Sequence, residues 1–416
     1  MTLAVTGATL DAQPVGLRAE QGRIVEVGPD VAPGTDDEVV TAEGMALVPG
    51  LVNGHTHAAM TLFRGYGDDL PLMEWLQGRI WPAEARLTAD DVYWGTRLAC
   101  VEMIRSGTVR FWDMYWQPGA TARAVDDTGL RATIGGPLID ALDPDRGAAL
   151  RDALRQHLDE LAASGPRVDA ALAPHSIYAV SEPSLRWIGE QAHERGLPVH
   201  IHLSETMEEV EQCVAAHGDR PAAYLDRLGL LGPRAVLAHG VWFDDDELAL
   251  VAERGATIVT NPVSNLKLAV GGVFRHGAAR DHGIPVGLGT DGASSNNSLD
   301  LLQDVKVFAL LQKHAARDPT VVPAAEAWAV ATGARAPLLG QSGRLAIGEP
   351  ADFVLVRTTA PELSMGDFTA GLVYSATGAV VDTTVVDGNV LMRRGIVEGE
   401  DEVRERAVAQ ARRLLT

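Results

Sequence analysis

Lysine is scarce in this chain. Only Lys267, Lys306 and Lys313 occur among 416 residues, and with 56 Asp and Glu against 35 Lys and Arg the formal net charge is -21. Because binding to a phosphate backbone requires a basic surface, this charge argues against nucleic acid as a bulk partner. The acidic surface is expected to favour solubility. Salt adaptation and a GC-rich source would each account for arginine in place of lysine.

The sequence also lacks long apolar segments. No run of 18 or more apolar residues occurs, and no basic region followed by an apolar stretch opens the chain. We therefore expect neither a membrane span nor a signal peptide, and a cytoplasmic location. The two cysteines, Cys100 and Cys213, are expected to be buried free thiols rather than a disulfide.

A pair of histidines, His55 and His57, follows the apolar run 46–52. Side chains alternate between the two faces of a strand, so both imidazoles of an H-x-H pair point to the same side and can bind one metal ion. Taken alone, the pair is more typical of hydrogen-bonded or exposed histidines at a strand end than of a ligand pair. Further candidate ligands in the same context favour the metal site.

Three later segments repeat the pattern of an apolar run that ends in a residue able to bind metal or transfer protons. The segments are 199–205 with His200, His202 and Glu205, 235–240 with His239, and 284–292 with Asp291. In a (β/α)8 barrel, the loops after the strands form the active site. Four such segments in chain order therefore predict one active site at the strand ends of a barrel.

The sequence between these motifs supports eight strands. After the strand that ends at His57, strands are predicted over residues 108–114, 131–139, 168–174, 198–203, 235–239, 256–261 and 285–290. Amphipathic helices are predicted over residues 148–163, 182–195 and 244–253, where apolar residues recur every three or four positions. This alternation indicates an α/β fold, a (β/α)8 TIM-type barrel.

The two ends of the chain are expected to lie outside the barrel. Short β-runs punctuated by glycine occupy residues 1–50 and return in residues 345–400. We expect them to pair into one small β-sandwich, with two unrelated β-appendages as the alternative. The catalytic barrel would then span residues 51–344, and a charged C-terminal helix residues 401–416.

The shortage of lysine bears on the number of metal ions. Barrel hydrolases with two metal ions often bridge them with a carbamylated lysine on a middle strand. The only lysine between His57 and Asp291 is Lys267, which follows the seventh predicted strand. We therefore expect a single divalent ion bound by His55, His57, His202 and Asp291. This nitrogen-rich set suits zinc, with ferrous iron as the alternative, and leaves a position open for water.

Several stretches resemble the amidohydrolase superfamily. They are PGLVNGHTH, HIHLSET, LAHG, TNPVSNLKLA and GLGTDGASSNNSLD, with WPAEARLT and APHSIYAVS between them. Within the superfamily they are most similar to the methylthioadenosine/S-adenosylhomocysteine deaminases and their chlorohydrolase relatives, over nearly the whole chain. The resemblance implies a metal-dependent hydrolase that converts an adenosine-type nucleoside into its inosine analogue and ammonia.

The resemblance also implies roles for single residues. It makes His55, His57, His202 and Asp291 the metal ligands. His200 faces the same way as His202, but the family ligand is the histidine three residues before the glutamate, which is His202.

For the chemical step, the resemblance implies a hydroxide that a metal makes available by lowering the pKa of water towards ~7. His239 and Asp291 would orient this hydroxide and take its proton. Glu205 would protonate the ring nitrogen beside the amino-bearing carbon, a general acid/base task worth roughly 10²- to 10⁴-fold. The alternative for Glu205 is a supporting contact to a metal ligand. Chlorohydrolase relatives often alter the glutamate or the aspartate ligand, and this chain keeps both, which favours deamination.

Substrate contacts are implied in the same way. Glu84 would bind the ribose diol and His175 the nucleoside, while Trp75 is predicted as a pocket wall, with a place in the core as its alternative. Relatives place an arginine after the third strand, where this chain has residues 133–137 without one. That departure argues against S-adenosylhomocysteine as a substrate. Arg146, predicted to lie in a loop after that strand, is a substitute, and a solvated surface arginine is the simpler interpretation.

Two other classes of function stay open. One is a different hydrolysis, such as deamination of guanine or another heterocycle, dechlorination of an s-triazine, or opening of a cyclic amide. Release of ammonia, chloride or a carboxylate would distinguish these reactions. The other is a non-catalytic barrel that binds nucleosides or metal, which turnover would exclude. The expected partner is a small purine nucleoside, with no nucleic acid and no membrane, and a homo-oligomer is compatible with the sequence.

Overall fold

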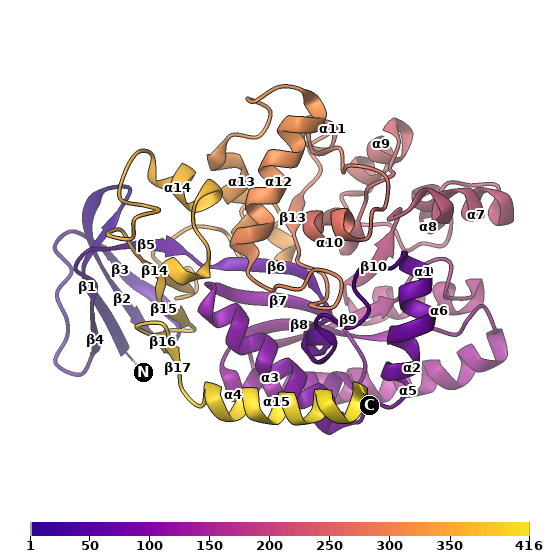
Figure 1. Cartoon of the computed structure of the whole chain (residues 1–416), viewed down its shortest axis with the longest axis horizontal. Helices are drawn as coiled ribbons and strands as arrows, with labels where there is room; N and C mark the ends of the chain where they lie inside the picture. Colours follow the sequence, from indigo (N-terminus) through magenta and orange to yellow (C-terminus); the bar gives the residue numbers. More distant parts are fainter. Residues whose placement is uncertain (1, 416) are drawn as a thin grey trace.

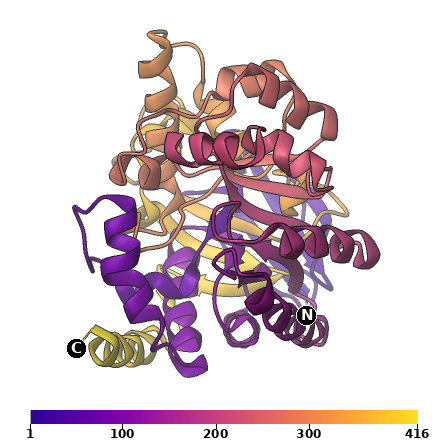
Figure 2. The same ribbon diagram turned by 90° about the vertical axis from the view of Figure 1, so that its right-hand side faces the viewer.

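The computed structural model describes residues 2–415, and two sheets organise this part of the chain. One is an eight-stranded parallel barrel, and the other is a nine-stranded sheet beside it (Figure 1). The nine-stranded sheet lies at the left of Figure 1, and helices cover the barrel strands above and below. Figure 2, which faces the end opposite that sheet, shows the helices arranged around the barrel strands.

The barrel strands lie side by side in chain order, and each pairs in parallel with the next. They are β6 (Leu51–Thr56), β7 (Thr108–Met114), β8 (Arg131–Leu138), β9 (Val168–Pro174), β10 (Val199–Leu203), β11 (Ala235–His239), β12 (Thr257–Thr260) and β13 (Val286–Leu288). The predicted barrel is confirmed. The bounds of β7, β9 and β11 are those predicted, and in the other strands the predicted and observed bounds differ by at most two residues.

The seam between the first and last barrel strands is closed by backbone and side chain together. The Asp291 N–H donates to the His55 carbonyl oxygen at 3.0 Å. Asn53 bridges to Thr290, accepting from its N–H at 3.1 Å through Oδ1 and donating to its Oγ1 at 2.7 Å through Nδ2. Asp291 has φ 63°, a left-handed conformation that turns the chain away from the strand direction. The seam therefore places Asp291 beside the first histidine.

Helices lie on the outside of the barrel and around its open end. The α-helices are α1 (Leu72–Trp75), α2 (Trp81–Glu84), α3 (Ala89–Arg105), α4 (Pro118–Thr128), α5 (Pro144–Ala162), α6 (Glu182–Arg195), α7 (Met207–His217), α8 (Pro221–Arg227), α9 (Asp245–Arg254), α10 (Pro262–Lys267), α11 (His276–Asp281), α12 (Leu301–Ala316), α13 (Ala324–Ala331), α14 (Phe368–Tyr374) and α15 (Glu400–Leu415). Shorter turns are η1 (Ala58–Phe63), η2 (Leu76–Ile80), η3 (Pro337–Leu339) and η4 (Gly378–Val380).

The start of α5 differs from the prediction. The helix begins at Pro144, four residues before the predicted 148, because the Asp143 carboxylate accepts hydrogen bonds from the backbone N–H groups of Asp145 and Arg146. Proline fits the first turn of a helix, where its missing N–H costs nothing. The Asp-Pro pair was the signal in the sequence that indicated the earlier start.

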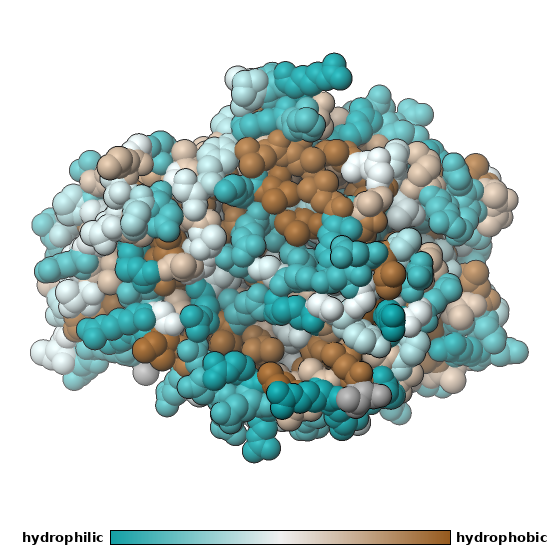
Figure 3. Space-filling model, viewed as in Figure 1, coloured by the Kyte–Doolittle hydropathy of each residue, from teal (hydrophilic) through white to brown (hydrophobic). Residues whose placement is uncertain are grey.

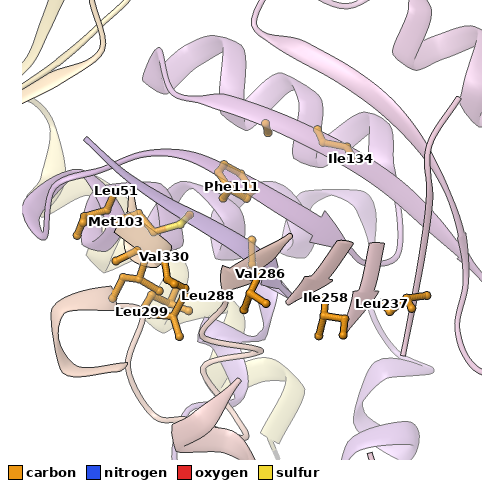
Figure 4. Close-up of a cluster of buried hydrophobic side chains, with 14 of the residues drawn as sticks. Leu51, Met103, Phe111, Ile134, Leu237, Ile258, Val286, Leu288, Leu299 and Val330 are labelled. Carbon is orange, nitrogen blue, oxygen red and sulfur yellow. The ribbon is translucent and has the colours of Figure 1, made fainter. Parts of the chain in front are cut away.

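The main core fills the layer between the barrel strands and the covering helices. Figure 4 shows part of this layer, where Leu51 of β6 and Phe111 of β7 belong to the same buried cluster as Met103 of α3 and Val330 of α13. Each such side chain stabilises the fold by about 1.5 to 3 kcal/mol relative to its exposed state. This packing holds the strand ends, and therefore the site, in place.

The nine-stranded sheet combines both ends of the chain, as predicted. Its strands are β1 (Thr2–Leu10), β2 (Gln13–Glu20), β3 (Arg23–Gly28), β4 (Glu38–Thr41), β5 (Met45–Pro49), β14 (Phe353–Arg357), β15 (Val381–Val386), β16 (Asn389–Arg393) and β17 (Ile396–Val397). The two ends join where β5 and β14 pair antiparallel, from Phe353 opposite Pro49 to Arg357 opposite Met45. The strands form one continuous sheet with a core of its own, which includes Leu47 and Phe353.

The outside of the molecule is mainly polar. Hydrophilic residues cover most of the face in Figure 3, in keeping with the acidic composition. None of the helices in residues 2–415 combines the length and the apolar character that crossing a membrane requires. Cys100 and Cys213 are both buried and free, as expected.

Candidate metal centre and active site

The predicted metal ligands converge at the carboxyl ends of the barrel strands. His55 lies in β6 with His57 just after it, His202 lies in β10, and Asp291 follows β13. Ligand atoms of His55, His202, Asp291 and His239, the last residue of β11, all lie within 4.8 Å of one another. His57 adjoins them, because its Nε2 is 3.2 Å from both Asp291 Oδ1 and His202 Nε2. The fold thus brings the whole predicted set together.

Each imidazole is held through Nδ1. Nδ1 of His55 lies 2.9 Å from Nε2 of His200, and Nδ1 of His239 lies 2.8 Å from Oδ1 of Asn265. The other two rings contact backbone carbonyl oxygens: Nδ1 of His57 lies 2.5 Å from that of Met114, and Nδ1 of His202 lies 2.7 Å from that of His175. With the Nδ1 proton donated to these acceptors, the lone pair of Nε2 in every ring is free to bind a metal. Histidines that bind metals usually donate their other N–H in this way.

Two features show that a cation fits this centre. The buried Nε2 of His55 makes no hydrogen bond within residues 2–415, and its near neighbour Asp291 Oδ1 is 3.4 Å away. The Nε2 atoms of His57 and His202 face each other at 3.2 Å, although both rings donate their Nδ1 protons elsewhere. Lone pairs at this distance repel each other unless a proton or a metal ion lies between them. The donor set fits one divalent ion with nitrogen-rich coordination.

Asp291 is held in an orientation that suits a ligand. Its Oδ2 accepts hydrogen bonds from the Ser264 hydroxyl at 2.6 Å and the Ser295 hydroxyl at 2.8 Å, which leaves Oδ1 directed at the histidines. Burial alone would raise the pKa of this carboxyl, but its contacts with His55 and His57 hold the pKa well below the usual range. Asp291 is therefore ionised at neutral pH.

Burial keeps most of the histidines neutral, which is the form that binds metal. It lowers the pKa of His55 to about 4 and that of His175 to about 3, and it takes the pKa of His202 well below its ordinary value. His57 differs, because its contact with Asp291 outweighs burial and raises its pKa to about 9. A bound cation would replace that proton.

Glu205 lies beside this group. It is buried, and Oε1 is 3.8 Å from His239 Nδ1. Burial raises the pKa of Glu205, the nearby His239 opposes that rise, and Asp291 adds to it. A raised pKa allows a carboxyl group to hold a proton near neutral pH, which a general acid requires.

His57, His202, His239 and Asp291 line one cavity together with Glu205. Its volume is about 660 Å³, its open mouth included. Trp75, Glu84 and His175, the three predicted substrate-binding residues, line it as well. The remaining wall is mainly apolar and aromatic, with Met60, Leu72, Leu76, Ile80, Trp81, Met114, Tyr115, Trp116, Pro137, Ile139 and Leu268 among its residues. Within residues 2–415, no arginine or lysine side chain lines this cavity.

Glu84 is fixed by two aromatic donors. The Tyr115 hydroxyl donates to Oε1 at 2.7 Å, and the Trp116 indole N–H donates to Oε2 at 3.2 Å. Burial raises the pKa of Glu84, and these two hydrogen bonds oppose the rise. Because a carboxylate oxygen has two lone pairs, each oxygen can still accept a further hydrogen bond from a ligand.

A family model described as the amidohydrolase family matches residues 46–391. The chain belongs to the amidohydrolase family. Among curated proteins, this amidohydrolase is 47% identical over 387 residues to a 5'-deoxyadenosine deaminase from Methanoregula boonei, covering 92% of this chain and 87% of that relative. It is 44% identical over 407 residues to a 5-methylthioadenosine/S-adenosylhomocysteine deaminase from Desulforudis audaxviator, covering 95% and 94%.

One solved structure is similar over nearly its whole length. The crystal structure of an adenosine deaminase from Xanthomonas campestris, with bound zinc, has a TM-score of 0.92 and 32% sequence identity, covering 99% of this chain and 98% of that one. The likeness extends over both the barrel and the nine-stranded sheet, because so little of either chain lies outside it.

Two cations that the sequence analysis considered lie away from the centre. Arg146 was predicted in a loop but is exposed in the first turn of α5, and it does not line the cavity. That prediction was wrong because Asp143 starts the helix before it. Lys267 donates from Nζ to Asp68 Oδ1 at 2.7 Å and to the Ser294 oxygen at 3.0 Å. It therefore fixes surrounding loops and bridges no metal ions.

Sequence reasoning missed the residues whose hydrogen bonds orient Asp291 and His239. Ser264, Asn265 and Ser295 lie in the stretches TNPVSNLKLA and GLGTDGASSNNSLD, which carried the resemblance without any role for these residues. His200 was seen, but its hydrogen bond to His55 was not. Hydrogen bonds between segments far apart in the chain leave no periodic signal in the sequence.

Proposed function

We propose that this amidohydrolase deaminates adenosine-type nucleosides with a small, uncharged 5' substituent, such as 5'-deoxyadenosine or 5'-methylthioadenosine. The observation that carries the proposal is that His202, His239 and Asp291 of the His and Asp cluster line the same largely apolar cavity as the buried Glu205. The names of the two curated relatives and of the solved structure support adenosine-type nucleosides as the substrate class, and one of those names includes S-adenosylhomocysteine. The preference for a small, uncharged 5' substituent is supported by the lining of the cavity.

We propose zinc as the metal, with ferrous iron as the alternative, and His55, His57, His202 and Asp291 as its ligands. The zinc in the similar adenosine deaminase and the nitrogen-rich donor set support this assignment. A divalent ion bound there would lower the pKa of water towards ~7, so that a nucleophile is available at neutral pH.

His239 is assigned the task of taking a proton from the attacking water. Its Nδ1 donates to Asn265 Oδ1 at 2.8 Å, so the neutral ring presents Nε2 as a proton acceptor. Asp291 Oδ1, which the two serine contacts to Oδ2 leave available, helps to orient the same water. Asn265 thus selects the tautomer that can act as a base.

Glu205 is assigned the transfer of a proton to the substrate. With its pKa raised by burial, it can donate a proton to the ring nitrogen beside the amino-bearing carbon as the nucleophile attacks. The deprotonated Glu205 can then take the proton of the newly added hydroxyl group and pass it to the leaving amino group, which departs as ammonia, while the proton taken up by His239 returns to Glu205. Atoms and charges balance with water as the only co-substrate.

The substrate-binding roles follow from the lining of the cavity. Glu84 would accept hydrogen bonds from the ribose diol, since Tyr115 and Trp116 fix its carboxylate and leave lone pairs free. His175, which burial keeps neutral, would contact the nucleoside, and Trp75 would form an apolar wall. The apolar remainder of the cavity suits a methylthio or deoxy group.

Ammonia release from a panel of substrates tests the proposal. The panel is adenosine, 5'-deoxyadenosine, 5'-methylthioadenosine, S-adenosylhomocysteine and guanine, each with metal-loaded protein. We expect ammonia from the small-tailed adenosines. Ammonia from guanine alone, or from none of the five compounds, would refute the proposed function.

A further inference from the structure

A second buried glutamate lies directly behind Glu205. Glu209 is in the first turn of α7, with only 4% of its surface exposed. Its two carboxylate oxygens accept two backbone hydrogen bonds, Oε1 from the Ser204 N–H at 3.0 Å and Oε2 from the Glu205 N–H at 2.9 Å. Both oxygens therefore bind the backbone of the turn that carries Glu205.

This contact is not the usual one at a helix start. Thr206 caps α7, and its Oγ1 accepts the Glu209 N–H at 3.2 Å. In a capping box, the glutamate at this position would return to the N–H of the capping residue itself. Glu209 instead reaches Ser204 and Glu205, the two residues before the cap. Its carboxylate therefore joins the helix to the end of strand β10.

The turn depends on such a contact. Ser204 is buried and has φ 53°, a left-handed conformation that is unfavourable for residues other than glycine. Its carbonyl oxygen accepts the Trp242 N–H at 3.0 Å, which attaches the turn to the loop after β11. Without Glu209, two buried N–H groups would lose their acceptor, and the strained turn would lose the bonds that hold it.

We propose that Glu209 is a positioning residue that holds the Glu205 carboxylate in the place and orientation needed for proton transfer. Glu209 does not line the cavity, so it acts through Glu205 and not on the substrate. The inference rests on the proposed deamination, in which Glu205 moves the proton. Glu209 would then support the reaction from the same segment that carries the proposed metal ligand His202 and the proposed acid Glu205.

The variant Glu209→Gln tests this role. Glutamine keeps the shape of the Glu209 side chain, but one carboxylate oxygen is replaced by an NH₂ group. That group faces a backbone N–H and cannot accept its hydrogen bond. We expect kcat for the best nucleoside to fall by about ten- to a hundredfold while KM stays within about threefold, because small displacements of a catalytic group cost rate more than binding. Metal content is expected to match the wild type.

The matched control is Glu208→Gln, one position away on the same helix. Glu208 is exposed, and within residues 2–415 its side chain accepts a single hydrogen bond, from Gln212 Nε2 at 3.0 Å. The side-chain replacement is the same, so a general effect of placing glutamine in the first turn of α7 would appear in both variants. We expect the control to keep kcat within about twofold of the wild type.

Other outcomes would overturn the inference. They are an unchanged kcat in Glu209→Gln, a rise in KM as large as the fall in kcat, or loss of metal or folding in both Glu209→Gln and Glu209→Asp. Failure of the proposed function is seen separately, as a wild type that releases no ammonia. In that case crystal structures of wild type and Glu209→Gln decide the matter: a displaced Glu205 carboxylate supports the inference, and an unmoved one refutes it.

Discussion

The 5' substituent of the nucleoside offers a quantitative test of the cavity. Its acidic lining residues are Glu84, Glu205 and Asp291, while no arginine or lysine side chain lines it within residues 2–415. The homocysteine tail of S-adenosylhomocysteine carries a carboxylate that would find no cation there. A hydrogen bond to a charged partner contributes about 1.5 to 3 kcal/mol, which corresponds to about ten- to a hundredfold in binding.

We therefore expect kcat/KM for 5'-methylthioadenosine to exceed that for S-adenosylhomocysteine by about ten- to a hundredfold. Initial rates of ammonia release, measured for both nucleosides at equal metal loading, give the ratio. The variant Glu84→Ala should impair both nucleosides alike, because the ribose diol is common to them. An equal or better rate with S-adenosylhomocysteine would refute the reasoning and direct attention to Arg146.

An added cation should narrow the difference. Ile139 follows β8 directly and lines the cavity, so Ile139→Arg would place a guanidinium there. We expect this variant to gain activity on S-adenosylhomocysteine relative to 5'-methylthioadenosine, while Ile139→Gln, similar in length but uncharged, should not. A gain in both variants would show that size or polarity, and not charge, limits the tail.

Three further predictions concern the metal, the acid and the nine-stranded sheet. Metal analysis should find one ion per chain and chelation should abolish ammonia release, whereas two ions per active chain would contradict the ligand set. Glu205→Gln should keep the metal but lower kcat by at least roughly a hundredfold, and loss of metal would give Glu205 a structural role instead. A hydrogen bond from Arg18, followed by that from the Gly34 N–H, lowers the pKa of Asp37 from 3.8 to about 2. Since the folded-state pKa is the lower one, Asp37 stabilises the fold above about pH 4 and this contribution is lost towards pH 2. Asp37→Asn should therefore lower the melting temperature at pH 7, and the difference from wild type should shrink as the pH falls, while a constant difference would contradict the assignment.

Local pattern in the sequence was enough to predict the barrel and the residue types of its site. Strand and helix periods of two and 3.6 residues are properties of neighbouring positions, so β7, β9, β11 and α6 were predicted at their observed bounds. The rule that barrel sites lie at strand ends then selected His55 and the other polar residues that follow apolar runs. The joining of both chain ends in one β-layer was inferred from similar β-runs at the two ends, whereas the pairing of β5 with β14 that joins them was seen only in the structure.

Only the tertiary structure decided how far each inward-facing side chain of a strand lies from the metal centre, and which distant segments contact one another. His200 and His202 lie on one face of β10 with the same alternation, yet His202 reaches the metal centre while His200 lies behind it and bonds to His55. Asn265 and Glu209 gained their roles because the fold brings their side chains to His239 and to the turn at Glu205. Such contacts join residues through space after the chain has closed into a barrel, so no local period in the sequence encodes them.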